Sequence, residues 1–314
     1  MKCSFLVAAL VACGGSSSHP HDAASVADAK LDSHAIDATP DAPAETVVNL
    51  SGGANALLWD GSAATMYLTD DGSDALLSDH AGTITTVATL PAESAGISLG
   101  GIVKRSDGTF LVMNFGFGSQ AKIFSVSGST AVETTGIPTA PKHIGLTADS
   151  NGVLYDNYFT GNSTSAAGGV GLVTVTGTTA TETEIAGSTT QAGFKKLVGI
   201  VATPSAVFVS DASQNTIFKI AVPGYALTTV ASSLPSADAL LMMPNGDLLT
   251  GGSSGMISRV TQAGAVSQLA LPAGATFGKI EGMAYDASSH MLWVVDHSTT
   301  AGTPDRLHIF SLAN

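Results

Sequence analysis

Basic residues are scarce in this chain of 314 residues: 12 Lys and Arg stand against 25 Asp and Glu, a formal net charge of -13. A nucleic-acid partner needs a basic surface to meet the phosphates, so this balance argues against such a partner. The excess of carboxylates fits a cation site, a cationic partner or an acidic surface in water. Hydrophobic residues make up 44% of the chain and charged residues only 12%, so a large core can form.

The apolar run near the N-terminus, residues 5–12, is far shorter than the roughly 20 residues that a helix needs to cross a bilayer. It follows a positive charge at Lys2 and ends in Leu10-Val11-Ala12-Cys13. This ending resembles the lipobox of bacterial lipoproteins, in which the cysteine is lipidated and becomes the first residue after cleavage. The alternative is an ordinary signal peptide that happens to contain a cysteine.

Only two cysteines occur, Cys3 and Cys13. Cleavage before Cys13 removes Cys3, so no disulfide within the mature chain is expected. Gly14, rather than an aspartate, follows Cys13. In the lipoproteins that the motif resembles, this favours the outer membrane. We therefore expect a signal peptide over residues 1–12, lipid at Cys13, and a periplasmic or surface-facing position on a bacterial outer membrane.

Residues 13–45 contain little that could be buried. They are rich first in Gly and Ser and then in Ala, Asp and Pro. Ordering such a segment costs conformational entropy that no core repays, so we expect a disordered tether. Its reach is roughly 30 Å, from 5–6 Å multiplied by the square root of its length.

Six weakly similar segments, each about 45 residues long, fill the chain from residue 46 onward. Each reads as a strand, a tight turn, a second strand ending in a small or acidic residue, and then a third and a fourth strand. A repeat of this length with four strands is typical of a β-propeller. Four of the turns carry the dipeptides that tight hairpins favour: Asp60-Gly61, Asp107-Gly108, Asn151-Gly152 and Asn245-Gly246.

The sixth segment reaches Asn314 directly after its third strand, while residues 46–50 precede the first segment and have strand character. Pairing residues 46–50 beside residues 307–312 completes the last blade and removes an open seam. We therefore predict an all-β fold, a six-bladed propeller over residues 46–314 whose last blade is completed by the N-terminal strand. A seven-bladed ring would need about 40 more residues.

Inner strands begin and second strands end at the same face of a propeller, so two sets of residues should surround one mouth. The first set is Asn55, Gly100, His143, Leu197, Asp238 and Glu281. The second set is Asp70, Asn114, Asn157, Asp211, Gly251 and Asp296.

Carboxylate and amide oxygens of this kind suit a divalent cation such as calcium. Asp238 and Glu281 are the first candidates, because they adjoin apolar strand starts that face the central channel. Further candidates for the cation are Asp70, Asn114, Asn157, Asp211, Asp296 and His143. The alternative for an aspartate that ends a strand is a structural role, in which it caps the next turn.

Aromatic residues gather in two loops predicted at the same mouth: Phe115, Phe117, Tyr158 and Phe159. They either cover the top of the core or form a shallow platform for a sugar, a peptide or a protein partner.

One blade carries a more specific pattern. Ile280-Glu281-Gly282-Met283-Ala284-Tyr285-Asp286, followed by Leu292-Trp293-Val294-Val295-Asp296, resembles the opening blade of the SMP-30/gluconolactonase-like (NHL-like) propellers. In that family the Glu of the Glu-Gly pair is a metal ligand, and an Asn and an Asp, each before a Gly, are further ligands. The resemblance implies a ligand role for Glu281. Asp238 matches in part, since Ala239 stands in place of the Gly, and His143 lies where the Asn is expected.

Two functions follow from these observations. The first is a membrane-tethered, extracytoplasmic binding module, expected as a monomer, that holds a small molecule, glycan or protein at its mouth. The second is a metal-dependent hydrolase of lactones or esters, in which Glu281 and Asp238 hold the cation and a metal-bound water is the nucleophile. The incomplete ligand set and the lack of a clear general base favour the binding module.

Overall fold

The computed structural model describes residues 45–50, 52–91, 97–116, 122–161, 166–187, 193–300 and 303–312. The chain divides into two units, residues 1–40 and residues 41–314, and every described residue belongs to the second. The expected signal peptide, Cys13 and almost all of the expected tether therefore lie outside the described residues.

The described residues fold into six antiparallel sheets of four strands each, here called blades 1 to 6. Blades 1 to 3 consist of β2 (Ala54–Asp60), β3 (Thr65–Asp70), β4 (Ala75–His80), β5 (Thr83–Thr89), β6 (Ile97–Lys104), β7 (Phe110–Gly116), β8 (Lys122–Ser127), β9 (Thr130–Thr134), β10 (Lys142–Ala148), β11 (Leu154–Thr160), β12 (Ala167–Thr176) and β13 (Thr179–Gly187). Blades 4 to 6 consist of β14 (Leu197–Thr203), β15 (Ala206–Asp211), β16 (Thr216–Ala221), β17 (Leu227–Ala231), β18 (Ala239–Met242), β19 (Leu248–Gly251), β20 (Ser258–Val260), β21 (Val266–Gln268), β22 (Lys279–Asp286), β23 (Met291–His297), β24 (Arg306–Ser311) and β1 (Thr46–Asn49).

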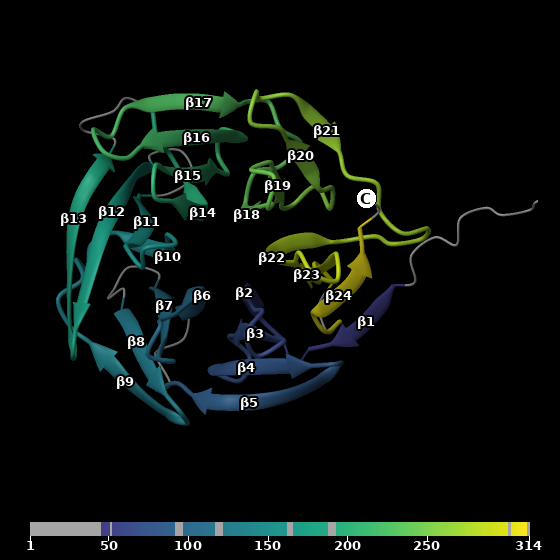
Figure 1. Cartoon of the computed structure of the whole chain (residues 1–314), viewed down its shortest axis with the longest axis horizontal. Coiled ribbons are helices and arrows are strands. Elements are labelled where there is room, and N and C mark those ends of the chain that lie inside the picture. The colour runs from purple at the N-terminus through teal and green to yellow at the C-terminus, as the bar shows by residue number, and fades with distance from the viewer. Residues whose placement is uncertain are drawn as a thin grey trace, which may run out of the picture. The chain divides into compact units, whose positions relative to one another are not determined.

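The blades surround a central axis, with β2, β6, β10, β14, β18 and β22 innermost (Figure 1). This arrangement confirms the predicted six-bladed propeller. The described part of the chain contains no helix, and so none that is long and apolar enough to cross a membrane. Apolar side chains of each blade pack against those of the next. Trp59 of blade 1 and Trp293 of blade 6, for example, stack with their ring centres 4.8 Å apart.

The ring closes where the sequence predicted. Strand β1 pairs antiparallel with β24, with Thr46 opposite Ile309, and so becomes the outermost strand of blade 6. Leu50, which follows β1, is only 4% exposed and donates its N–H to the carbonyl oxygen of Asp305 at 2.8 Å. The two ends of the described chain are thus held in one blade.

Inner strands approach one another closely around the axis, and glycine permits the approach. A Cβ at Gly100 would lie 2.0 Å from the carbonyl oxygen of Ile144 in blade 3. One at Gly282 would lie 2.3 Å from the carbonyl oxygen of Asn55 in blade 1. Real Cβ atoms essentially never show such contacts, so a larger residue at either position must move a strand.

Polar side chains from second strands join neighbouring inner strands. Thr69 Oγ1 lies 3.4 Å from the carbonyl oxygen of Gly100 in blade 2, to which it donates. Ser210 Oγ accepts the N–H of Gly199 at 2.8 Å and donates to the carbonyl oxygen of Asp238 in blade 5 at 2.5 Å. Backbone groups near the axis thereby gain partners that the sheets themselves do not supply.

Closing the ring through β1 predicts a measurable dependence on Leu50. Leu50→Ala removes a buried side chain at the seam, and we expect the free energy of unfolding to fall by about 2–4 kcal/mol. Val47→Ala, on the 44% exposed side chain of β1, should change it by less than about 1 kcal/mol. Denaturant unfolding of both variants compares the two values, and equal losses would show that the seam does not depend on the buried end of this segment.

Candidate functional site

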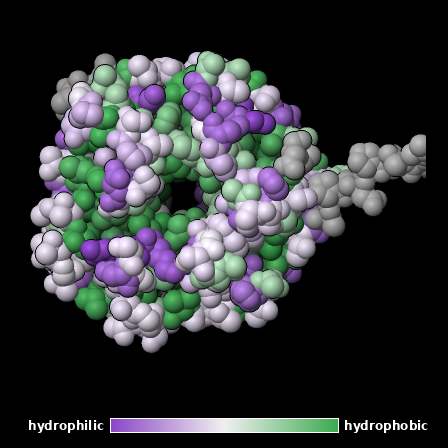
Figure 2. Space-filling view, in the orientation of Figure 1, coloured by the Kyte–Doolittle hydropathy of each residue, from purple (hydrophilic) through white to green (hydrophobic). Residues whose placement is uncertain are grey.

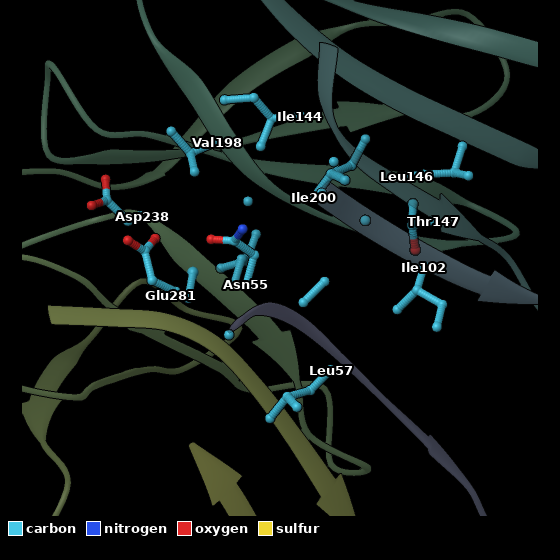
Figure 3. Close-up of a pocket in the computed structure, with 18 of the residues that line it drawn as sticks. Asn55, Leu57, Ile102, Ile144, Leu146, Thr147, Val198, Ile200, Asp238 and Glu281 are labelled. Atoms are coloured by element: carbon cyan, nitrogen blue, oxygen red, sulfur yellow. The ribbon is translucent and has the colours of Figure 1, made fainter. Parts of the chain in front are cut away.

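A cavity of about 450 Å³ follows the propeller axis and is lined by the inner strands of all six blades. Its opening is visible as the central hollow of the space-filling view (Figure 2). Three polar side chains of this cavity come from adjacent blades: Asp238 precedes β18 of blade 5, Glu281 belongs to β22 of blade 6, and Asn55 belongs to β2 of blade 1. They lie together on one wall (Figure 3).

Asn55 is held so that its amide oxygen faces this group. Its Nδ2 donates to Asp71 Oδ2 at 2.9 Å and to the carbonyl oxygen of Gly53 at 3.2 Å. In Figure 3 the amide oxygen points toward Glu281 and Asp238. Burial raises the pKa of Asp71 to about 6, and the carboxylate also accepts the N–H of Leu99 at 2.5 Å. Asp71 is therefore a positioning residue for Asn55.

Two lysines lie beside the carboxylates. Lys279 Nζ is 2.5 Å from Glu281 Oε1, and Lys196 also lines the cavity. Burial raises the pKa of Asp238 above its usual value; the charges of Lys279 and Lys196 oppose this shift and that of Glu281 adds to it. Among the described residues, none donates a hydrogen bond to the Asp238 carboxylate. This wall thus offers both donors and acceptors, with two positive and two negative side chains.

The rest of the cavity wall is largely apolar. Ile144 and Val198 lie near the polar wall, with further aliphatic side chains beyond them (Figure 3): Leu57, Ile102, Leu146 and Ile200. Phe115 and Phe159 also line the cavity, and their ring centres are 6.2 Å apart. Lys196 Nζ lies 5.9 Å from the centre of the Phe159 ring. A ligand that fills this space meets a polar wall on one side and an aliphatic and aromatic wall on the other.

The aspartates at the ends of second strands serve the backbone. Asp211 accepts the N–H groups of Lys195 at 2.7 Å and Lys196 at 3.2 Å. Asp296 accepts the N–H of Lys279 at 3.2 Å and a hydrogen bond from Arg306 Nη2 at 2.5 Å. Asp211 also accepts the N–H groups of Ser213 and Gln214 in the turn that follows β15, which matches the capping alternative. The contacts with Lys195, Lys196 and Lys279 fix the segments that carry both lysines of the site.

Asp70 has the same local role, since its Oδ2 accepts from Ser73 Oγ at 2.6 Å and its Oδ1 from the N–H of Gly72 at 3.3 Å. Asn114 is fully buried, and neither polar atom of its side chain has a hydrogen-bond partner in the described part of the chain. Asn157 Oδ1 accepts the N–H of Gly145 at 2.8 Å. These three residues do not line the cavity.

Blade 3 differs in register from the predicted alignment. In blade 1 the inner-strand residue Ala54 pairs with Asp70, and in blade 3 the equivalent pair is His143 and Tyr158. Tyr158 therefore occupies the place equivalent to Asp70, and Asn157, which was expected there, lies one residue earlier. Ile144, rather than His143, consequently lines the channel. Tyr158 is buried and its hydroxyl donates to Glu184. Phe115 and Phe159 stay candidates for ligand contact, whereas Phe117 lies outside the described residues.

His143 instead belongs to a second polar group that sequence reasoning missed. Its Nδ1 lies 2.6 Å from Asp156 Oδ2 and its Nε2 lies 3.5 Å from Glu182 Oε2, all inside blade 3. Burial would lower the pKa of His143, but the hydrogen bond with Asp156 raises it above its usual value. Burial and the nearby Asp156 raise the pKa of Glu182 to about 7. Of these three residues, sequence reasoning named only His143, because Asp156 and Glu182 do not end a second strand or begin an inner strand.

No protein-family model matches the chain, and no curated protein sequence matches it significantly. Several solved structures are similar to this chain. A gluconolactonase from Xanthomonas campestris has a TM-score of 0.62 at 16% identity, covering 85% of this chain and 88% of the other. A calcium-binding regucalcin from Agrobacterium tumefaciens has a TM-score of 0.62 at 12% identity, covering 85% and 93%. A virginiamycin B lyase from Staphylococcus aureus has a TM-score of 0.56 at 15% identity, covering 86% and 100%.

The gluconolactonase and regucalcin neighbours are SMP-30/gluconolactonase-like six-bladed propellers, as the resemblance around Glu281 predicted. Their identities to this chain are low, so the likeness establishes the fold.

Substituting a carboxylate that binds the backbone should destabilise the fold more than substituting one that lines the cavity. Asp211→Ala removes the acceptor of part-buried N–H groups in two loops, before β14 and after β15, and we expect the free energy of unfolding to fall by about 2–3 kcal/mol. Asp238→Asn removes a carboxylate that accepts no hydrogen bond from the described residues, and we expect a change below about 1 kcal/mol. Urea denaturation measures both. A larger loss for Asp238→Asn would mean that Asp238 serves the fold rather than the cavity.

Proposed function

We propose that the propeller binds a small organic molecule in its axial channel, with a polar end on the wall of Asn55, Asp238 and Glu281. The observation that carries this proposal is the division of one cavity into that polar wall and an apolar wall of aliphatic and aromatic side chains. A volume of about 450 Å³ falls in the range of roughly 300–1,000 Å³ that small-molecule sites occupy.

The charges of the polar wall narrow the class of ligand. Lys196 and Lys279 balance Asp238 and Glu281, so the wall has little net charge and offers hydrogen-bond donors as well as acceptors. A neutral, hydroxyl-rich or zwitterionic head group satisfies both kinds of partner, whereas a simple anion or cation leaves one kind unpaired. We therefore favour an amphipathic molecule with a hydroxylated head and an apolar body.

We also propose that lipid at Cys13 tethers this binding module to a bacterial outer membrane, on its periplasmic or outer side. The support is the Leu10-Val11-Ala12-Cys13 sequence and the Gly/Ser-rich stretch that follows it.

A second candidate function is cation-dependent hydrolysis of a lactone or ester. It is favoured by the convergence of Asn55 Oδ1 with the Asp238 and Glu281 carboxylates, because oxygen donors of this kind suit a hard cation such as calcium. These three residues would hold the cation, and Glu281 would exchange its contact with Lys279 for the ion. A cation bound there would polarise a substrate carbonyl or activate water. The gluconolactonase and regucalcin neighbours support this candidate through the fold.

Binding can be tested with octyl β-D-glucoside, below its micelle concentration, as a probe that has a hydroxylated head and an apolar tail. We expect calorimetry to detect one site per chain, and Glu281→Gln or Asp238→Asn to weaken binding at least about tenfold, because charge-assisted hydrogen bonds are lost. Asp107→Asn, in the exposed turn between β6 and β7, is the matched control and should bind as the wild type does.

The wild type and the same variants also distinguish the hydrolase from the binding module. Hydrolysis of D-glucono-1,5-lactone that requires added calcium or manganese and disappears in Glu281→Gln would support the hydrolase. Probe binding without lactone turnover would support the binding module. Unchanged binding in both channel variants would contradict the proposed site.

The anchor predicts a change of fraction in the cell. Cys13→Ser should move the protein from the membrane fraction to the soluble fraction, because the acylated thiol is the attachment point. Mass spectrometry of the wild-type N-terminus should find a lipid-modified Cys13. An unmodified N-terminus at another residue would rule out the lipoprotein proposal.

A further inference from the structure

A buried polar group inside blade 3 is unrelated to the channel. His143 of β10, Asp156 of β11 and Glu182 of β13 each offer one ligand atom, and these atoms all lie within 4.8 Å of one another. The side chains of His143 and Asp156 are 0% exposed and that of Glu182 is 5% exposed. None of the three lines the axial cavity.

The position of the group in the fold follows from strand alternation. Asp156 lies on the same face of β11 as Leu154, because side chains two residues apart share a face. Leu154 packs in the apolar cluster between blades 2 and 3, with Leu111 and Met113 of blade 2. The polar group therefore lies on the face of blade 3 that packs against blade 2.

Two carboxylate oxygens of the group have no hydrogen-bond partner among the described residues: Asp156 Oδ1 and Glu182 Oε2. Leaving a buried oxygen of this kind unpaired is costly, and more so for a charged carboxylate. No Lys or Arg in the described part of the chain pairs with either residue, and Glu184, bonded to Tyr158, adds a further carboxylate nearby. The only described cationic group in contact with Asp156 and Glu182 is His143.

The backbone around these side chains is built to leave space for them. A Cβ at Gly171 would lie 2.3 Å from Asp156 Oδ1, and one at Gly187 would lie 2.3 Å from Glu184 Oε1. Glycines of β12 and β13 thus make room for carboxylates that a closely packed apolar blade would not need.

We propose that His143, Asp156 and Glu182 form a structural binding site for a divalent transition-metal ion such as zinc. The 3.5 Å between His143 Nε2 and Glu182 Oε2 is close to the roughly 3.4 Å that separates two ligands at 2.0–2.2 Å from a tetrahedral zinc ion. One imidazole nitrogen with carboxylate oxygens suits zinc or manganese, whereas calcium and magnesium prefer oxygen alone.

Each residue has a defined part in this site. Asp156 Oδ2 accepts the Nδ1–H of His143 and so turns Nε2 toward Glu182, the arrangement in which a carboxylate orients a metal-bound histidine. Asp156 Oδ1 and Glu182 Oε2, which have no hydrogen-bond partner among the described residues, would supply the negatively charged oxygens that balance the charge of the ion. Nε2 also lies 3.1 Å from the carbonyl oxygen of Pro138, to which it can donate. Metal binding therefore requires that Nε2 lose any proton it carries.

The test uses the full chain, stripped of metal with EDTA, in a background where His19, His21 and His34 are changed to Gln to remove the N-terminal histidines. We expect elemental analysis to find about one zinc ion per chain after dialysis against zinc, and a higher melting temperature, since an ion that binds only the folded state stabilises it. Zinc-edge X-ray absorption should show one imidazole among nitrogen and oxygen ligands.

Variants locate the site. Glu182→Gln should weaken zinc binding at least about tenfold, while the matched channel variant Glu281→Gln should retain it. If Glu182→Gln does not fold, Asp156→Asn and the X-ray absorption of the wild type decide. Zinc content near zero with no change in melting temperature would identify the group as a metal-free polar network and overturn the proposal. Zinc lost in Glu281→Gln but kept in Glu182→Gln would place the ion in the channel and also overturn it.

Discussion

Crowding of six inner strands around one axis is the constraint on which the rest of the structure depends. Strands that approach so closely exclude side chains at some positions and leave backbone groups that no sheet partner can reach. Glycine answers the first demand, at Gly100 and Gly282 for example. Short polar side chains from second strands answer the second, as Ser210 does by joining Gly199 to Asp238. The side chains of other inner positions, Asn55 and Glu281 among them, line the channel.

The same constraint organises the charges of the channel. Asp211 and Asp296 bind the backbone just before β14 and within β22, and so fix the positions from which Lys196 and Lys279 reach the cavity. The carboxylates at the ends of second strands thus shape the site without lining it. Asp238 and Glu281, which the ring leaves facing the cavity, meet lysines that nearly cancel their charge.

Much of this could be predicted from the sequence, because the repeat, the turn dipeptides and the strand-like segment ahead of the first repeat all reflect local chemistry. The sequence pointed to Asp238 and Glu281 because each directly precedes a run of small and apolar residues in its inner strand. The register of blade 3 could not be read in this way. His143 pairs with Tyr158 as Ala54 pairs with Asp70, so Ile144 takes the channel-lining place that Asn55 has in blade 1. Neighbouring residues of similar pattern do not reveal this offset of one residue. Glu182 was missed because it lies in an outer, Thr-rich strand whose polar side chains normally face water.

Closing the ring with the first strand also has a mechanical consequence. Any tension carried by the chain ahead of Thr46 reaches the folded domain through β1, whose only sheet neighbour in the described structure is β24. The load therefore falls on one short ladder of backbone hydrogen bonds and on the burial of Leu50 behind it. A force on the chain that precedes Thr46 therefore acts first on the pairing of β1 with β24. The strength of this pairing sets the force at which the ring opens.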